Sequence, residues 1–333
     1  MRILLVKMSS MGDVIHTLPA LTDALNANPN LKIDWLIEPA FADIPAWHPA
    51  VNAVIPVSLR HWRKNLLNIT TWRDIKNVFK KIRSTQYDFI IDAQGLLKSA
   101  LIAKIARGKI HGFNSNSARE SLASFFYDQR YFIDKNQHAI SRTRELFSKI
   151  LHYPLSSVAP NYQIDHAQLL AVNFSLEKNY WVFLHGTTWK TKCYPERYWQ
   201  QLLTLADQKN QTVYLPWGNK HEKQRAESLA RNHTHAIVLP KLTIAELATL
   251  LKNATAVIAV DTGLGHLSAA LSTPTISLYG PTNPKRVGTW GDHQIHLCAT
   301  IISDEINIHP DTIWAMLSTI KEASHAHVSK TIY

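Results

Sequence analysis

Two short segments of the chain combine residue types that can bind a phosphate group. In the first, the apolar stretch Ala254–Val260 runs into Asp261-Thr262-Gly263-Leu264-Gly265-His266, which predicts a buried strand, a turn of small residues and a helix start. N–H groups in the first turn of a helix have no intrahelical partners, and the helix dipole adds about half a positive charge there, so a phosphate is stabilised. Ordinary capping of the helix by Asp261 or Thr262 explains the motif, taken alone, equally well.

The second segment lies at the start of the chain and presents a carboxylate. Residues Arg2–Lys7 predict a strand, Ser9–Asp13 a turn, and Val14 the opening of a helix. The two glycine-containing turns are about 250 residues apart, which favours two domains with a ligand cleft between them. Asp13, at the tip of its turn, is either a functional acid or a charge that the helix dipole favours.

A third loop adds hydroxyls and a cation after another buried strand. Thr187 and Thr188 follow Phe183-Leu184, and Lys192 comes four residues later. Hydroxyls at the carboxyl end of a strand can bind a phosphate, and Lys192 can neutralise a departing diphosphate; a turn cap and a solvated lysine are the plainer alternatives. Glu222 either accepts hydrogen bonds from a ribose or is a first-turn acid that the helix dipole favours. His266 either binds the donor or has a structural role.

Together these residues predict group transfer. A nucleotide diphosphate on one domain and a carboxylate on the other supply a leaving group and a base, which is the layout of a glycosyltransferase. No Asp-x-Asp motif follows an apolar strand, so the leaving-group charge falls to Lys192 and helix dipoles, without an obligatory metal.

Length and composition favour a globular protein of two domains. The chain has 333 residues, of which 46% are hydrophobic, and no apolar run reaches the roughly 18 to 20 residues that span a bilayer. The apolar run near the N-terminus is too short for a signal peptide, so we expect a cytoplasmic protein. The two cysteines, Cys193 and Cys298, have neither the spacing of a disulfide framework nor that of a zinc site.

Positive charge is concentrated in the first half. Residues 1–165 hold 21 Lys and Arg against 13 Asp and Glu, a net charge of +8 out of +11 for the whole chain. Residues 60–83 carry eight cations and one acid, Asp74. Such a segment attracts nucleic acid, an anionic membrane surface or an anionic acceptor, and it also suits a solvated helix face.

Strands and helices alternate along both halves, with a link near 155–178. Short apolar strands between helices predict parallel sheets covered on both faces, and therefore an α/β fold of two doubly wound domains. The predicted strands are Ile33–Ile37, Ala53–Val57, Phe89–Ile91, Trp181–Leu184, Thr212–Leu215, Ala236–Leu239, Thr255–Val260 and Thr275–Leu278. The predicted helices are 14–26, 71–83, 96–107, 196–207, 220–231, 243–252, 264–271 and 310–323.

Three motifs resemble those of the lipopolysaccharide heptosyltransferases, glycosyltransferase family 9. They are Lys7–Pro19, Asp92–Ser99 and Val260–His266, and the resemblance spans nearly the whole chain. The loop from Thr187 to Lys192 is most similar to that of type I enzymes, which add the first heptose to the Kdo region of lipid A precursors. The resemblance implies a GT-B fold, in which two Rossmann-like domains face a central cleft.

The resemblance also implies a reaction. L-glycero-D-manno-heptose would pass from ADP-heptose to Kdo of the Kdo2-lipid A acceptor, with inversion and with no cofactor, during synthesis of the lipopolysaccharide inner core. Residues 1–165 would bind the acceptor and 166–310 the nucleotide sugar, while the helix and tail at 311–333 could pack back on the N-terminal domain or on the second one.

Roles carry over by position. Asp13 would be the general base, and Lys192 would stabilise the departing ADP, with Leu242 lining the adenine pocket. The donor residues implied are Thr187, Thr188, Lys192, Glu222, Leu242, Asp261, Thr262, Gly263, Leu264 and His266.

The acceptor candidates are arginines and a lysine, because Kdo carboxylates and lipid A phosphates suit bidentate cations. They are Arg60, Arg63, Lys64, Arg119 and Arg144. The protein is then expected at the anionic cytoplasmic face of the inner membrane, as a peripheral protein. Trp62 and Ser124–Tyr127 are candidate membrane contacts, although core packing also explains these aromatics.

Three alternatives stay open at this point. A type II enzyme would transfer to an existing heptose, and a GT-B sugar-nucleotide epimerase would need no acceptor. A basic nucleic-acid-binding protein would need no nucleotide sugar, and its affinity would fall steeply with salt. The paired strand-turn-helix segments argue against nucleic acid as the partner.

Overall fold

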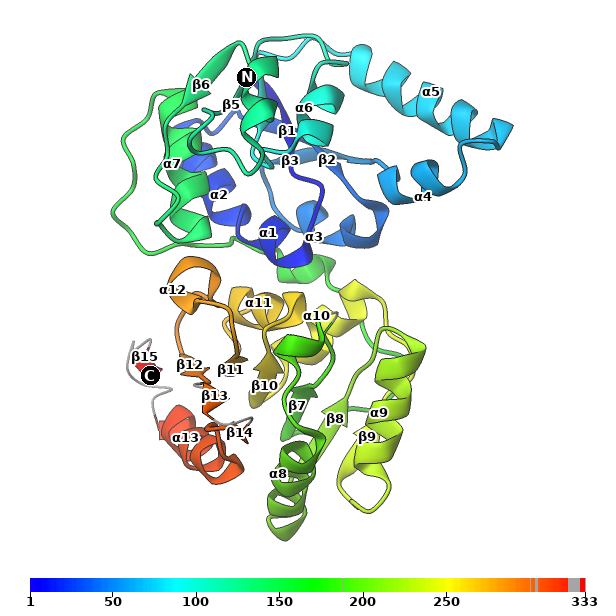
Figure 1. The fold of residues 1–333 in the computed structure, drawn as a ribbon, viewed down its shortest axis with the longest axis vertical. Coiled ribbons are helices and arrows are strands. Elements are labelled where there is room, and N and C mark those ends of the chain that lie inside the picture. Colours follow the sequence, from blue (N-terminus) through cyan, green and yellow to red (C-terminus); the bar gives the residue numbers. More distant parts are fainter. Residues whose placement is uncertain (188, 300, 303–304, 323–329, 333) are drawn as a thin grey trace. The chain divides into compact units, whose positions relative to one another are not determined.

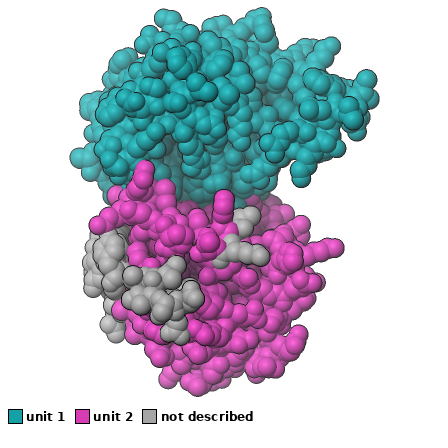
Figure 2. All heavy atoms as spheres, viewed as in Figure 1, with its two compact units in different colours: residues 1–166 teal, residues 167–333 magenta. Residues whose placement is uncertain are grey.

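The computed structural model describes residues 1–187, 189–299, 301–302, 305–322 and 330–332. Thr188, a predicted donor residue, lies outside them. The chain divides into two compact units, Met1–His166 and Ala167–Tyr333 (Figure 1, Figure 2). Each unit is built on a parallel sheet whose strands are connected through helices, which confirms the predicted α/β, doubly wound fold.

The first unit contains a six-stranded parallel sheet in the order β3-β2-β1-β4-β5-β6. Its strands are β1 (Arg2–Val6), β2 (Lys32–Ile37), β3 (Val51–Pro56), β4 (Phe89–Asp92), β5 (Ile110–Phe113) and β6 (Gln129–Tyr131). The strand order reverses between β1 and β4. At such a switch point the loops after the two strands diverge and leave room for a ligand. Here the loop after β1 leads into α1, which carries Asp13, and the loop after β4 carries Gln94.

Helices of the first unit pack on the sheet through apolar stripes. They are α1 (Met11–Ile15), α2 (Leu18–Ala27), α3 (Asp43–Ala46), α4 (Leu59–Lys64), α5 (Ile69–Arg83), α6 (Leu97–Ala103) and α7 (Ala139–Leu151), with 3-10 helices η1 (Pro39–Phe41) and η2 (Ser121–Phe126). α5 and α6 share one core with alternate residues of the central strands, whereas α2 and α7 contact each other.

Two helix predictions for this unit were wrong in detail. The single helix expected at 14–26 is two helices, α1 and α2, and Pro19 stands in the first turn of α2, where a residue without an N–H is tolerated. The helix expected at 96–107 ends at Ala103. The sequence reading also missed β5 and β6, which are only four and three residues long and lack a continuous apolar run.

The second unit contains a seven-stranded sheet in the order β15-β12-β11-β10-β7-β8-β9. Its strands are β7 (Tyr180–Leu184), β8 (Thr212–Leu215), β9 (Ala236–Val238), β10 (Ala256–Val260), β11 (Thr275–Tyr279), β12 (Gln294–Cys298) and β15 (Lys330–Ile332), with a separate pair, β13 (Ile301–Ile302) and β14 (Glu305–Ile306). The order reverses between β7 and β10. The loops after these two strands hold Thr187 and Asp261.

The helices of the second unit are η3 (His166–Gln168), η4 (Lys190–Lys192), α8 (Glu196–Gln208), α9 (Lys220–Ala230), α10 (Ile244–Lys252), α11 (Gly263–Ala270), α12 (Pro284–Val287) and α13 (Pro310–Glu322). Five of them, α8, α9, α10, α11 and α13, lie close to their predicted positions, whereas the short helices η3, η4 and α12 were not predicted. The sequence left open which domain the last helix joins. In the structure α13 packs on α8 and β11 of the second unit, with Ile313 and Leu317 buried and the Trp314 ring edge-on to Trp181. None of the described helices has the length and apolar character needed to cross a bilayer.

Candidate active site

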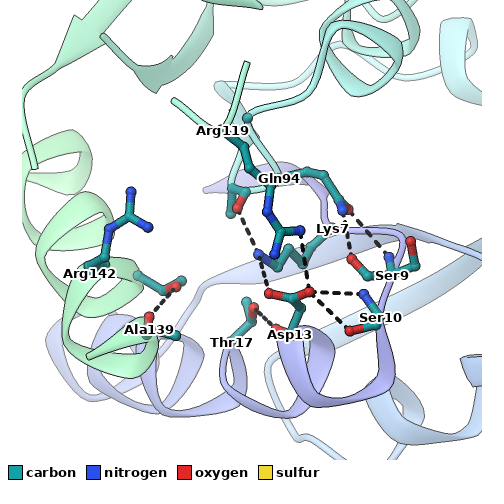
Figure 3. A network of polar contacts seen from close by, with 12 residues as sticks. Lys7, Ser9, Ser10, Asp13, Thr17, Gln94, Arg119, Ala139 and Arg142 are labelled. Carbon is teal, nitrogen blue, oxygen red and sulfur yellow. Dashed lines mark hydrogen bonds and ion pairs between the residues drawn. The ribbon is translucent and has the colours of Figure 1, made fainter. Parts of the chain in front are cut away.

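Asp13 lies at the switch point of the first unit, in the first turn of α1. Its Oδ2 accepts hydrogen bonds from the Ser10 N–H at 3.0 Å and the Ser10 hydroxyl at 3.1 Å, so it caps its own helix (Figure 3). Two cations hold the same carboxylate: Lys7 Nζ is 3.6 Å from Oδ1, and Arg119 Nη1 is 3.6 Å from Oδ2. Asp13 is therefore a first-turn acid, as the dipole alternative expected, and it also lies in a strongly cationic environment.

This environment keeps Asp13 ionised. Burial disfavours the charged carboxylate, but the charges of Lys7 and Arg119 and the Ser10 N–H outweigh burial and hold the pKa of Asp13 well below its usual range. Burial in turn lowers the pKa of Lys7, an effect that Asp13 opposes. Lys7 also donates to the Ala93 carbonyl at 3.0 Å, so its ammonium group is held in one place.

Gln94, which sequence reasoning placed in a motif without giving it a role, holds the loop between β1 and α1, which we call the Asp13 loop because it leads to Asp13. The Gln94 side-chain oxygen accepts from the N–H groups of Met8 and Ser9, at 2.7 and 3.3 Å, and its amide donates to the Ser9 carbonyl at 2.6 Å. These residues lie 85 or 86 positions apart and meet because β1 and β4 are neighbours. Gln94 is therefore a positioning residue for the Asp13 loop.

Asp92, at the end of β4, anchors Gln94 in turn. One carboxylate oxygen accepts from the N–H groups of Gln94 and Gly95, and the other accepts from the hydroxyls of Ser99 and Tyr127 at 2.8 Å each. Burial raises the pKa of Asp92, and these four hydrogen bonds oppose that rise. The signal available in the sequence was a polar Asp-x-Gln-Gly run directly after an apolar strand.

Arg119 approaches Asp13 from the segment between β5 and η2. Gly95 makes this approach possible: its φ is +69°, and a Cβ there would lie 3.2 Å from the Arg119 backbone nitrogen. The Arg119 side chain is 59% exposed although its guanidinium reaches Asp13. Of the five acceptor candidates, this is the one that the structure brings to the carboxylate.

In the second unit, Lys192 and Asp261 form an ion pair at the switch point between β7 and β10. Lys192 Nζ lies 2.6 Å from Asp261 Oδ2, and the carboxylate is buried whereas the lysine is about one-quarter exposed. The Thr187 hydroxyl lies 3.5 Å from the Asp261 carbonyl oxygen. The loop after β7 and the turn after β10 therefore meet at this edge of the sheet.

The α11 N-terminus has the properties of a phosphate site. The helix begins at Gly263, with Leu264 second and His266 fourth, and His266 is buried. Thr262 occupies the N-cap position, yet its side chain makes no capping hydrogen bond within the described part of the chain. Capping therefore does not account for Thr262, and the first-turn N–H groups favour an anion. Gly265 serves packing, because a Cβ there would lie 3.2 Å from Ala259 Cβ on β10.

Glu222 stands in the first turn of α9, and Leu242 lies in the loop before α10 of the same unit. The Glu222 carboxylate accepts from the Gly218 N–H at 2.7 Å, and it packs so closely on Gly186 that a Cβ there would lie 2.7 Å from Glu222 Cδ. Glu222 thus stands beside the loop that carries Thr187. Leu242 is half-buried just before α10, and the Trp217 indole donates to the Leu239 carbonyl at the start of that loop.

The remaining acceptor candidates separate into two groups. Arg60, Arg63 and Lys64 are exposed on α4, while Trp62 between them is buried in the core, so the suggestion that Trp62 touches a membrane is wrong. In the Ser124–Tyr127 segment, Ser124 and Tyr127 are likewise buried and Phe125 alone is well exposed.

Arg144 differs from the other acceptor candidates because its guanidinium is already occupied. It donates to both carboxylate oxygens of Asp23 on α2, at 2.6 and 3.2 Å, and to the Ser156 and Val158 carbonyls. Its side chain is 8% exposed. We therefore leave Arg144 out of the acceptor site and assign it to the contact between α7 and α2.

Removing this guanidinium is expected to destabilise the first unit. Arg144→Met leaves Asp23 buried and unpaired, which should lower the free energy of unfolding by about 3–5 kcal/mol in a urea titration. Arg107→Met, at an exposed arginine of the same unit, is the control and should change it by about 0.5 kcal/mol or less. Equal stabilities for the two variants would contradict the structural role of Arg144.

Comparison with known proteins agrees with this geometry. The family model for glycosyltransferase family 9 (heptosyltransferase) matches residues 75–312. The chain is 50% identical over 301 residues to lipopolysaccharide heptosyltransferase 1 of Pseudomonas aeruginosa, covering 89% of this chain and 83% of that protein.

Solved structures of a heptosyltransferase are similar along almost the whole chain. The E. coli heptosyltransferase WaaC with ADP has a TM-score of 0.89 at 42% identity, over 96% of this chain and 100% of that one. The same enzyme with ADP-2-deoxy-2-fluoro heptose has a TM-score of 0.86 at 42% identity, over 96% and 99% of the two chains. This likeness confirms the predicted GT-B fold. The chain therefore belongs to glycosyltransferase family 9, the heptosyltransferases.

Proposed function

We propose that this glycosyltransferase is a type I heptosyltransferase, which moves L-glycero-D-manno-heptose from ADP-heptose to Kdo of Kdo2-lipid A. The similar relative is named lipopolysaccharide heptosyltransferase 1, and the similar structures hold ADP or a fluorinated ADP-heptose. The observation that carries the proposal is the ionised Asp13 at a switch point, with the exposed guanidinium of Arg119 3.6 Å away. A base and a cation for an anionic acceptor thus stand side by side.

In the proposed reaction Asp13 takes the proton from a Kdo hydroxyl while the hydroxyl oxygen attacks the anomeric carbon. The bond from that carbon to the ADP oxygen breaks, ADP leaves with the electron pair, and the configuration inverts. A carboxylate of low pKa can serve here because the attacking hydroxyl becomes strongly acidic as its new bond forms. A Kdo carboxylate that draws Arg119 away would also make Asp13 more basic, since it removes one of the cations.

The second unit would hold the donor and receive the negative charge of the departing ADP. In the proposed complex the diphosphate replaces Asp261 as the partner of Lys192 and meets the first-turn N–H groups of α11. Glu222 would accept from the ribose and Leu242 would line the adenine pocket. The proposed donor residues otherwise remain those of the sequence analysis: Thr187, Thr188, Asp261, Thr262, Gly263, Leu264 and His266.

The acceptor would be held by Arg119 together with the α4 cations. Arg60, Arg63 and Lys64 are exposed, and no acidic side chain of the described chain forms an ion pair with them, so they are available to carboxylates and phosphates. Because the acceptor is a lipid, we also propose that the enzyme works as a peripheral protein on the anionic cytoplasmic face of the inner membrane.

The state of Asp13 predicts the pH dependence of transfer. A carboxylate whose pKa is lowered stays in its basic form as the pH falls, until the pH reaches that lowered pKa. We therefore expect kcat/KM to show no acid limb attributable to Asp13 between about pH 5 and pH 8. The pH profile should be measured for the parent enzyme and for Arg119→Ala. Loss of one cation raises the pKa of Asp13, so any acid limb should move to higher pH in the variant. A limb that moves downward in this variant would contradict the assignment.

Mass spectrometry of Kdo2-lipid A incubated with ADP-heptose and the enzyme tests the function. The expected result is a gain of one heptose and the release of ADP. Transfer only to an acceptor that already carries heptose would favour the type II reaction, and conversion of the sugar nucleotide without an acceptor would favour an epimerase. No change in any of these mixtures, with folded protein and intact donor, would overturn the proposal.

A further inference from the structure

The turn between α4 and α5 exposes an unusual group of large apolar side chains. Single apolar residues on a surface are common, but several together at one projecting point mark an interaction surface. This turn lies at the outer end of the α4–α5 pair, where the pair projects from the first unit (Figure 1). The exposed fractions are 48% for Leu66, 105% for Leu67, 84% for Ile69 and 56% for Trp72. We call these four residues the apolar tip.

Hydrogen bonds hold the apolar tip in a defined conformation. The Trp72 indole N–H donates to the Leu66 carbonyl at 2.8 Å. The Asn68 side chain caps α5 by accepting from the Thr70 N–H at 2.9 Å, and the Asn65 N–H bonds to the Trp62 carbonyl at 3.0 Å. Because the buried Trp62 fixes the other side of the turn, the tip presents its apolar side chains outward without folding on binding.

A stripe of cations continues from the apolar tip along the outer face of α5. Ile75, Val78, Phe79 and Ile82 pack on the core, which turns the opposite face of the helix to solvent. On that face, residues three or four positions apart follow Ile69: they are Arg73, Lys76, Lys80 and Arg83, all exposed. Within the described residues none of these four cations forms an ion pair, so their positive potential is not neutralised locally. We call these four residues the cationic stripe.

We propose that the apolar tip and the cationic stripe form the surface by which this enzyme docks on an anionic lipid bilayer. Leu67 and Ile69 would enter the boundary between headgroups and acyl chains, Trp72 would lie at headgroup level, and the cationic stripe would meet the lipid phosphates. The combination favours a bilayer over nucleic acid, since leucine and isoleucine side chains gain free energy by entering an apolar phase, whereas phosphates are bound by cationic and polar side chains.

This inference rests on the proposed function only in its purpose, because a lipid acceptor gives the enzyme a reason to reach the bilayer. Docking itself needs neither donor nor acceptor and can be measured separately. The residues also differ from the proposed catalytic and acceptor residues: α5 and its preceding turn supply the docking surface, whereas α4 and Arg119 supply the acceptor cations.

The test is co-sedimentation of the full chain with lipid vesicles that contain no acceptor. Vesicles of phosphatidylethanolamine with about one-third phosphatidylglycerol supply the anionic surface, and phosphatidylcholine vesicles supply the neutral one. We expect at least tenfold tighter binding to the anionic vesicles, with an affinity that falls as salt rises. Leu67→Asp/Ile69→Asp should weaken binding at least tenfold, and Lys76→Glu/Lys80→Glu should weaken it similarly and flatten the salt dependence.

Matched controls use exposed residues of the same unit away from α5. Leu155→Asp/Val158→Asp replaces two exposed apolar side chains, and Lys109→Glu reverses an exposed cation; both should bind like the parent protein. Equal affinity of the parent protein for anionic and neutral vesicles would overturn the proposal. Binding of both α5 variants at the parent affinity would overturn it as well. So would tighter binding to duplex DNA than to anionic vesicles at the same salt concentration.

Activity distinguishes this proposal from the proposed function. With a short-chain, water-soluble Kdo acceptor the α5 variants should keep the parent kcat and KM, whereas with acceptor embedded in anionic vesicles their KM should rise about as much as docking weakens. If the parent protein transfers heptose to neither acceptor, the proposed function is refuted and the vesicle-binding result still stands. Loss of docking in the parent protein, with transfer to the soluble acceptor intact, would refute the docking surface alone.

Discussion

Asp13→Asn is expected to lower kcat for heptose transfer by about 10²–10⁴-fold. Asparagine has the shape of aspartate and can still accept hydrogen bonds from Ser10, but it cannot take a proton from the acceptor hydroxyl. Affinity for ADP-heptose should stay nearly unchanged, because the proposed donor residues all belong to the second unit. Single-turnover rates at saturating donor, together with the donor Kd from calorimetry, measure both quantities.

The control for this variant is Asp43→Asn. Asp43 is another acid in the first turn of a short helix of the same unit, but it is exposed, and no cation of the described residues forms an ion pair with it. It should transfer heptose at the parent rate. A kcat for Asp13→Asn within threefold of the parent value would remove Asp13 from the role of base, provided that thermal unfolding shows the variant to be folded.

Lys192→Met is expected to lower kcat by about 10²–10³-fold and to raise the KM for ADP-heptose. Methionine keeps most of the length of the side chain but removes the charge that would meet the diphosphate as negative charge develops on it. The substitution also leaves the buried Asp261 carboxylate without its cation, 2.6 Å away in the structure, so an anionic donor would be repelled. Initial rates over a range of donor concentrations separate the two effects.

Asp261→Asn in the Lys192→Met background shows which effect dominates. If Lys192 served only to neutralise Asp261, the double variant would regain parent activity, and the leaving-group role would be wrong. We expect the double variant to recover part of the donor affinity while kcat stays low. Lys220→Met, at an exposed lysine at the start of α9, is the matched control and should behave like the parent enzyme.

Sequence patterns located most of the second unit because its elements are long and strongly patterned. The predicted strand Trp181–Leu184 corresponds to β7, Tyr180–Leu184, and the predicted helix at 196–207 corresponds to α8, Glu196–Gln208. Buried parallel strands are apolar throughout and their helices are amphipathic, so local residue order contains both signals. Where elements are short, as in β6 with three residues, no local pattern distinguishes a strand from a loop.

Exposure was harder to predict than secondary structure. Trp62 and Trp72 both lie among basic residues, yet Trp62 of α4 is buried in the core whereas Trp72, part of the apolar tip, is more than half exposed. Arg119 and Arg144 are the same residue type, yet the guanidinium of Arg144 is bound by Asp23 whereas that of Arg119 reaches Asp13. Arg144 and Asp23 are 121 positions apart, so no local sequence pattern predicts their contact.

The sequence by itself determined the class of fold, the family and the motifs from which the candidate residues come, because hydrophobic periodicity and short motifs are local properties of the chain. The tertiary structure decided which of these residues meet. Parallel sheets place strands from distant parts of the chain side by side, so β1 and β4 bring Gln94 to the Asp13 loop, and β7 and β10 bring Lys192 to Asp261. The charge state of Asp13 likewise follows from burial and from two cations that only folding delivers.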